Sequence, residues 1–105
     1  MKLAPNDLER IANLFRTFSE PTRLAILQEL KDGEKSVSEI VNALTTTQAN
    51  VSKQLRLLHE SSILTRRKEG TRVLYCIEDP IVFELCSLVC NKLNHDRGMP
   101  KRLKF

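Results

Sequence analysis

The segment TTTQANVSKQLRLLHES, Thr45 to Ser61, limits the possible fold of this chain more than any other stretch. Val51, Leu55 and Leu58 recur at i, i+4 and i+7, which predicts a narrow apolar stripe along a helix of about four turns. Thr47 is a good N-cap because its hydroxyl can accept a hydrogen bond from a free first-turn N–H. The opposite face carries short polar and cationic side chains that suit base edges and phosphates, namely Gln48, Ser52, Lys53 and Arg56.

A shorter helix is predicted just before this segment. Ser36 and Glu39 have the S-x-x-E form of a capping box, and apolar residues follow at helical spacing, namely Ile40, Val41 and Leu44. A short capped helix, a tight turn and a helix with a polar outer face predict a helix-turn-helix. The same pattern also fits two packed helices whose polar face is only solvated.

After Ser61-Ser62 the periodicity changes from helical to alternating. Residues 65–68 and 72–77 form two short runs around Glu69-Gly70-Thr71, which predicts a hairpin with Gly70 at a positive φ. A hairpin rich in cations beside a reading helix is a wing. Arg66, Arg67, Lys68 and Arg72 are expected to approach phosphates or a minor groove.

Three further helices complete the expected fold. Leu8, Ile11, Phe15 and Phe18 predict a first helix that begins near Pro5. Pro21 opens a second, with Glu20 or Ser19 as its cap, and Gly33 follows its end. A last helix is predicted from Asp79-Pro80 to about His95. It is apolar around much of its circumference, so we expect it to be buried on two sides, the second side by another copy of the chain.

Charge and composition narrow the class of partner. The net charge is +4, and residues 47–72 hold six basic and two acidic residues, which favours a polyanion. No apolar run is long enough to span a membrane and the start has no signal-peptide core, so we expect a cytoplasmic protein without a membrane partner. Three cysteines, an odd number in a reducing compartment, argue against a disulfide framework.

Two stretches resemble the ArsR/SmtB family of bacterial winged-helix repressors. SEPTRLAIL, Ser19 to Leu27, is similar to the opening D-P-T-R-L-x-I-L of the family. Thr45 to Ile77 resembles its S-Q-x-x-V-S-x-H-L-x-x-L-x-x-A-G-L-V-x-x-x-R-x-G-R-x-x-Y-Y. The resemblance implies a homodimer built on the first and last helices that binds an inverted-repeat operator in double-stranded DNA. It also implies that Gln48, Ser52 and Lys53 face the major groove, and that a metal ion, a metalloid or a thiol-reactive species releases the DNA.

None of the sensor sites known in that family is intact in this chain. Asp79 matches the start of the last-helix metal site, but its partner positions read Ile81 and Lys92, and only His95 could still ligate. The C-V-C thiolate site of the family falls on Ser36-Val37-Ser38, which contains no cysteine.

Cys86 and Cys90 remain as a candidate effector site. They lie at i and i+4 on the last helix, so their Cβ atoms are expected about 5–6 Å apart. With the cysteines of a second copy they could bind Zn, Cd, Pb or As(III), or react with an oxidant or a sulfur species. Cys76 and His95 are possible accessory ligands. The alternative is that these cysteines act as small hydrophobic residues in an interface.

The sequence therefore predicts a mainly α protein with a small β-hairpin, a winged helix-turn-helix of order α-α-α-α-β-β-α. Residues 1–95 would form the DNA-binding and dimerisation domain, and residues 96–105 a flexible basic tail. The expected function is a DNA-binding repressor that a thiol-directed effector releases and that requires no cofactor. The expected contacts to DNA are Thr47, Gln48, Asn50, Ser52, Lys53, Arg56, Arg66, Arg67, Lys68 and Arg72. A winged-helix module that binds protein and not DNA is the alternative. An enzyme is disfavoured because no catalytic grouping or phosphate-binding glycine loop is present.

Overall fold

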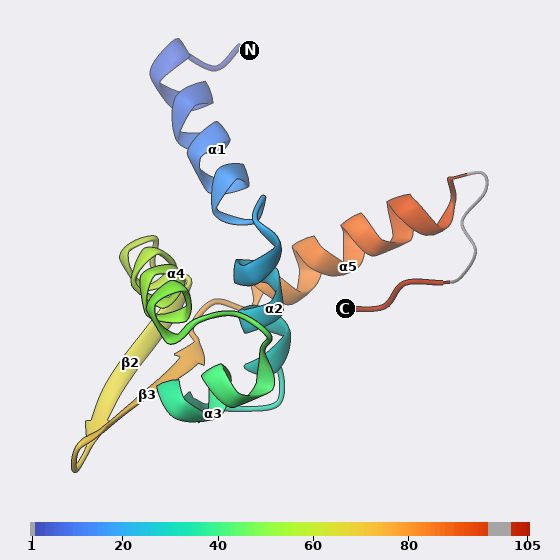
Figure 1. Cartoon of the computed structure of the whole chain (residues 1–105). Coiled ribbons are helices and arrows are strands. Elements are labelled where there is room, and N and C mark those ends of the chain that lie inside the picture. Colours follow the sequence, from blue (N-terminus) through green and yellow to red (C-terminus); the bar gives the residue numbers. More distant parts are fainter. Residues whose placement is uncertain (1, 97–101) are drawn as a thin grey trace.

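The computed structural model describes residues 2–96 and 102–105. Its body contains α2 (Pro21–Glu29), α3 (Val37–Ala43), α4 (Gln48–Glu60) and a small sheet, and two further helices project from that body (Figure 1). These are α1 (Pro5–Thr17) and α5 (Ile81–Asn94). The radius of gyration is 15.5 Å, whereas a compact domain of 100 residues has about 13 Å. The projecting helices account for the difference.

The helix starts follow the predicted capping chemistry. The Glu20 carboxylate accepts hydrogen bonds from the N–H groups of Thr22 and Arg23 at the start of α2, each 3.0 Å long. Ser36 and Glu39 form the reciprocal capping box of α3, and the Thr47 hydroxyl caps α4 by accepting from the Asn50 N–H. At the start of α5 the N-cap residue is Pro80, and the Asp79 carboxylate accepts a hydrogen bond from the Ile81 N–H.

The core lies between α2, α3, α4 and the sheet, and the first turns of α5 cover one side of it. Its fully buried members include Ile26, Leu27, Ile40 and Val82. The apolar stripe of α4, formed by Val51, Leu55 and Leu58, is completely inaccessible to solvent. The burial of this stripe leaves the opposite face of α4 as its only outer surface.

The predicted hairpin is present, and a third strand joins it. Strands β2 (Leu64–Glu69) and β3 (Arg72–Ile77) pair antiparallel around a turn in which Gly70 has φ +64°. The short strand β1 (Lys35–Ser36) pairs with the other edge of β3, so the sheet order is β1-β3-β2. The sequence-based order lacked β1, because two residues are too few to show a period. With that addition, the winged helix-turn-helix fold is confirmed.

The two projecting helices carry most of the exposed apolar surface. No residue of α1 is buried, and Leu8, Ile11, Leu14 and Phe15 are all exposed. On α5, only Val82 and Cys86 are buried, whereas Leu88 is 66% exposed and Val89 is 50% exposed. In the described parts of the chain, no helix has both the length and the apolar character needed to cross a membrane.

The end of the chain returns to α5 and to the core (Figure 1). The Asn94 side chain makes two hydrogen bonds with the backbone of Leu103, of 2.6 and 2.8 Å. Lys31 donates to the backbone oxygen of Phe105, and the Phe105 ring packs against the core. The sequence analysis predicted a flexible tail over residues 96–105. Residues 97–101 of that tail lie outside the described part of the structure.

Candidate nucleic-acid interface and thiol cavity

The outer face of α4 is polar, cationic and open to solvent. Gln48, Ser52, Lys53 and Arg56 are all exposed. Their positions follow from the burial of Val51, Leu55 and Leu58, which fixes the rotation of the helix about its axis. This face therefore combines hydrogen-bonding groups with two cations.

Two of the expected DNA contacts have internal roles. The Thr47 hydroxyl is the N-cap of α4. Asn50 is half-buried, and its side chain donates to Thr46 Oγ1 and accepts from Gln54 Nε2, each over 3.0 Å. These bonds hold the turn before α4 in place, so both residues position the reading helix whether or not they also touch DNA.

A buried hydrogen-bond network continues from Asn50 to the end of α1. Gln54 is only 6% exposed, and its Oε1 accepts from Arg23 Nη1 over 2.7 Å. The same guanidinium donates to the backbone oxygens of Thr17 (2.8 Å) and Arg16 (2.9 Å). We call the set Arg23, Gln54, Asn50 and Thr46 the Arg23–Gln54 network. It connects α1 directly to the reading helix.

Sequence reasoning missed the roles of Arg23 and Gln54. Gln54 stands directly before Leu55 in a polar-looking run, and nothing local shows that it turns inward. The available signal was its spacing, since Gln54 lies three residues after Val51 and four before Leu58, on the border of the apolar stripe.

The wing cations fall into two groups. Arg67 forms ion pairs with Glu34 (2.5 Å) and Glu69 (3.1 Å), and Arg72 pairs with Glu39 at 3.0 Å. Hydrogen bonding to Arg67 lowers the pKa of Glu34, and the backbone N–H of Ser36 is the largest cause of the lowered pKa of Glu39. Arg66 and Lys68 form no ion pair within the described residues, so their charges are available to a polyanion.

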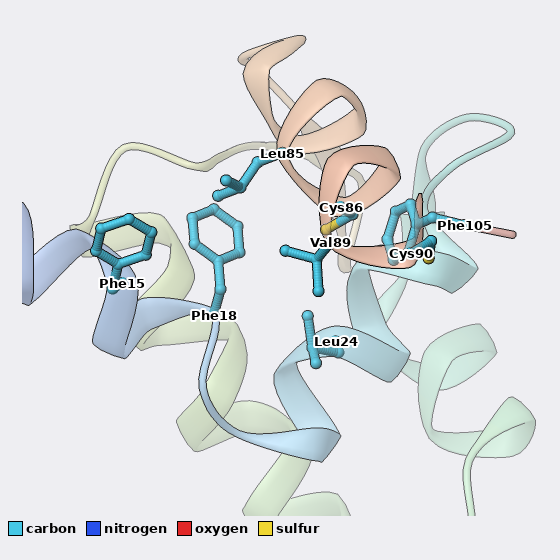
Figure 2. A pocket seen from close by; sticks show the side chains of 8 residues that line it. All are labelled: Phe15, Phe18, Leu24, Leu85, Cys86, Val89, Cys90 and Phe105. Atoms are coloured by element: carbon cyan, nitrogen blue, oxygen red, sulfur yellow. The ribbon is translucent and has the colours of Figure 1, made fainter. Parts of the chain in front are cut away.

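A thiol-bearing cavity of about 240 Å³, partly open to solvent, lies between α5, the end of α1, α2 and the returning end of the chain. Its wall consists of Phe15, Phe18, Leu24, Leu85, Cys86, Val89, Cys90 and Phe105 (Figure 2). Cys86 is buried and Cys90 is half-buried. Burial, followed by the effect of neighbouring Cys90, raises the pKa of the Cys86 thiol.

The possible accessory ligands lie elsewhere. The Cys76 sulfur is 3.1 Å from the Thr65 hydroxyl on the hairpin, and His95 Nδ1 is 2.6 Å from the Asn91 carbonyl oxygen. Over residues 2–96 and 102–105, no three side chains among His, Cys, Asp and Glu are grouped so that they could hold a metal ion. One subunit thus offers two sulfur donors, and a closed four-ligand metal site would need a second copy.

The comparisons with known proteins agree on one protein family. Residues 20–65 match the model described as bacterial regulatory protein, arsR family. The chain is 39% identical over 82 residues to an uncharacterised HTH-type transcriptional regulator of Methanocaldococcus jannaschii, covering 77% of this chain and 92% of that protein. It is 33% identical over 72 residues to the repressor SmtB of Mycobacterium tuberculosis, covering 69% of this chain and 53% of that protein.

The fold gives the same result. The crystal structure of AntR, an antimony-specific transcriptional repressor, superimposes with a TM-score of 0.76 at 26% identity. The superposition covers 89% of this chain and 85% of AntR. These relatives are transcriptional regulators and not enzymes.

Proposed function

The chain belongs to the ArsR family of bacterial regulatory proteins, and from this premise we propose that it is a homodimeric repressor whose two copies of α4 read adjacent major grooves. The observation that carries the proposal is the contrast between the two faces of α4. One face is completely buried in the core, and the other is exposed, polar and cationic. Arg66 and Lys68 of the wing add cations beside it that can contact phosphates.

The dimer follows from the apolar surface that one copy leaves in water. The exposed apolar residues of α1 and α5 form faces that a soluble monomer rarely keeps. Their burial against a second copy would place two reading helices about 34–36 Å apart, one turn of the duplex, over an inverted repeat. Residues 1–95 would then serve both DNA binding and dimerisation.

Substitution of Lys53 tests the DNA-reading role. A specific duplex is first selected from a random pool, and affinity is then measured by fluorescence anisotropy over a range of salt concentrations. We expect affinity to fall steeply with salt, and Lys53→Ala to weaken specific binding more than binding to unrelated DNA. Lys2→Ala is the matched control, because Lys2 is exposed near the far end of α1. Equal losses in both variants would refute the assignment of α4.

The proposed effector site is the pair Cys86 and Cys90. The two thiols line one cavity on α5, the helix proposed to contact the partner copy. An effector that favours a non-binding dimer by about 1–3 kcal/mol would weaken DNA affinity roughly 5–150-fold. The antimony-specific relative AntR supports a metalloid or another soft, thiol-seeking species. If the Cys86→Ser, Cys90→Ser double variant still releases DNA when Zn(II), Cd(II), As(III), peroxide or polysulfide is added, the cysteines are structural.

A further inference from the structure

The hydrogen bonds before and within the first turns of α4 have a fixed direction, which originates at Arg23. A guanidinium can donate hydrogen bonds but cannot accept them. Gln54 must therefore present its Oε1 to Arg23 Nη1, over 2.7 Å, and turn its Nε2 toward Asn50. Because an amide nitrogen can only donate, Asn50 must accept this bond with its Oδ1, over 3.0 Å.

The same direction reaches the hydroxyl of Thr46. The remaining polar group of Asn50 is its Nδ2, which donates to Thr46 Oγ1 over 3.0 Å. A hydroxyl has one proton and two lone pairs, so this bond occupies a lone pair and leaves the proton free to donate. Among the described residues, the bond from Asn50 is the only side-chain hydrogen bond of Thr46. The network therefore ends in an unused donor, which the charge at its other end polarises.

The Thr46 hydroxyl lies at the surface beside the reading helix. Thr46 is half-buried and lines an open hollow of about 220 Å³ between the start of α2 and the turn that joins α3 to α4. The other lining residues are Pro21, Thr22, Ala25, Leu44 and Thr45. None of the six is charged, so no carboxylate in this wall repels an anion. Since the first residues of a reading helix approach the base edges, the turn before α4 would pass the phosphates that border the groove.

We propose that Thr46 donates a hydrogen bond to a backbone phosphate of the operator, and that the rest of the Arg23–Gln54 network positions this donor. The inference rests on the proposed function, because it requires the outer face of α4 to lie in the groove. Hydroxyl contacts to phosphates fix the register of a protein on the duplex. This bond would therefore set the depth and position at which α4 reads the bases.

Gln54→Glu reverses the direction of the network with little change in shape. The new carboxylate accepts from Arg23 as the amide does, but its second oxygen can also only accept, so the Asn50 amide must turn and donate to it. Asn50 Oδ1 then faces Thr46 and accepts the hydroxyl proton. The donor to DNA is lost, whereas the ion pair with Arg23 retains the fold.

The experiment combines this reversal with removal of the hydroxyl. Thr46→Val removes the hydroxyl at nearly constant size, and Thr46→Ser keeps it. Each is made with and without Gln54→Glu, and fluorescence anisotropy gives the dissociation constant for the selected duplex. We expect Thr46→Val to weaken binding at least about tenfold, and Thr46→Ser to bind within about twofold of wild type. In the Gln54→Glu background, Thr46→Val should cost less than about twofold, because the donor is already lost.

Thr45→Val is the matched control, since Thr45 lines the same hollow without joining the network. Its effect on affinity should simply add to that of Gln54→Glu. Urea unfolding of every variant shows whether affinity follows stability, as it would if Thr46 had only a structural role.

Three results would overturn the contact and leave the repressor intact. They are wild-type affinity in Thr46→Val, an equal loss from Thr46→Val in both backgrounds, and losses of affinity that follow the free energy of unfolding across the variants. If the wild-type protein bound no duplex from the random pool, the repressor would be refuted and the phosphate contact with it.

Discussion

At the scale of single residues, Ser62 carries local backbone strain. Its φ is +62°, a left-handed conformation that non-glycine residues rarely adopt. The Ser62 N–H donates to the His59 carbonyl and the Ile63 N–H to the Leu58 carbonyl, each over 3.0 Å, which is the Schellman pattern at the end of α4. The strain is the consequence of ending α4 where β2 must begin.

Ser62→Gly is therefore expected to stabilise the protein. Relief of about 1–2 kcal/mol of left-handed strain is partly offset by the greater freedom of glycine in the unfolded chain, which leaves a net gain of roughly 0.5–1 kcal/mol. Urea unfolding measures it. Ser61→Gly is the control, because Ser61 has φ −84° and gains nothing. If the Ser62→Gly variant were less stable than the wild-type protein, the inferred strain at Ser62 would be contradicted.

Gln54→Leu tests the Arg23–Gln54 network. The substitution puts an apolar side chain of similar size in the core. It leaves Arg23 Nη1 and Asn50 Oδ1 without the hydrogen-bond partner that Gln54 supplies. We expect a loss of about 1–3 kcal/mol in the free energy of unfolding, with weaker specific DNA binding because α4 and its entry turn lose their support. Gln28→Leu, an exposed glutamine on α2, should change stability by less than about 0.5 kcal/mol. Similar effects in both variants would exclude the network as a support of α4.

At the scale of elements, local chemistry was readable from the sequence and distant contacts were not. The caps at Ser36 and Thr47 and the turn at Gly70 need only residues a few positions apart, and all three were predicted, while the cap of α2 was narrowed to Glu20 or Ser19. Strand β1 exists because Lys35 and Ser36 meet Tyr75 and Leu74, about 40 residues later. No local pattern encodes such a pairing.

The candidate site shows the same division. The exposed face of α4 follows from the helical period alone. The ion pairs of Arg67 and Arg72 depend on Glu34 and Glu39, which lie elsewhere in the chain. Nothing in the sequence therefore distinguishes these two cations from Arg66 and Lys68. The return of Phe105 to the thiol cavity also has no local signal, since the residues just before it are mostly charged.

Arg66 and Arg67, adjacent on β2, should differ in their effect on DNA binding. Arg66 has a free charge among the described side chains, whereas the charge of Arg67 is already compensated by Glu34 and Glu69. We expect Arg66→Ala to reduce the slope of log affinity against log salt concentration by about 1, and Arg67→Ala to change it less. A larger change of slope for Arg67→Ala would show that its ion pairs open on DNA.

At the scale of the whole molecule, the proposed repressor requires a second copy of the chain. The exposed residues of α1 and α5 cannot be buried by the small core of one chain, because both helices project from it. Leu88→Glu places a charge on the most exposed apolar residue of α5 and should separate the subunits. Ser87→Glu adds the same charge to the neighbouring polar position and should leave the assembly intact.

Sedimentation velocity of the wild-type protein, alone and with the selected duplex at low salt, tests whether the chain is a dimer that binds DNA. We predict a dimer in free solution and a complex of two chains with one duplex, which dissociates as salt is raised. A monomer that sediments unchanged in the presence of DNA at low ionic strength would contradict it.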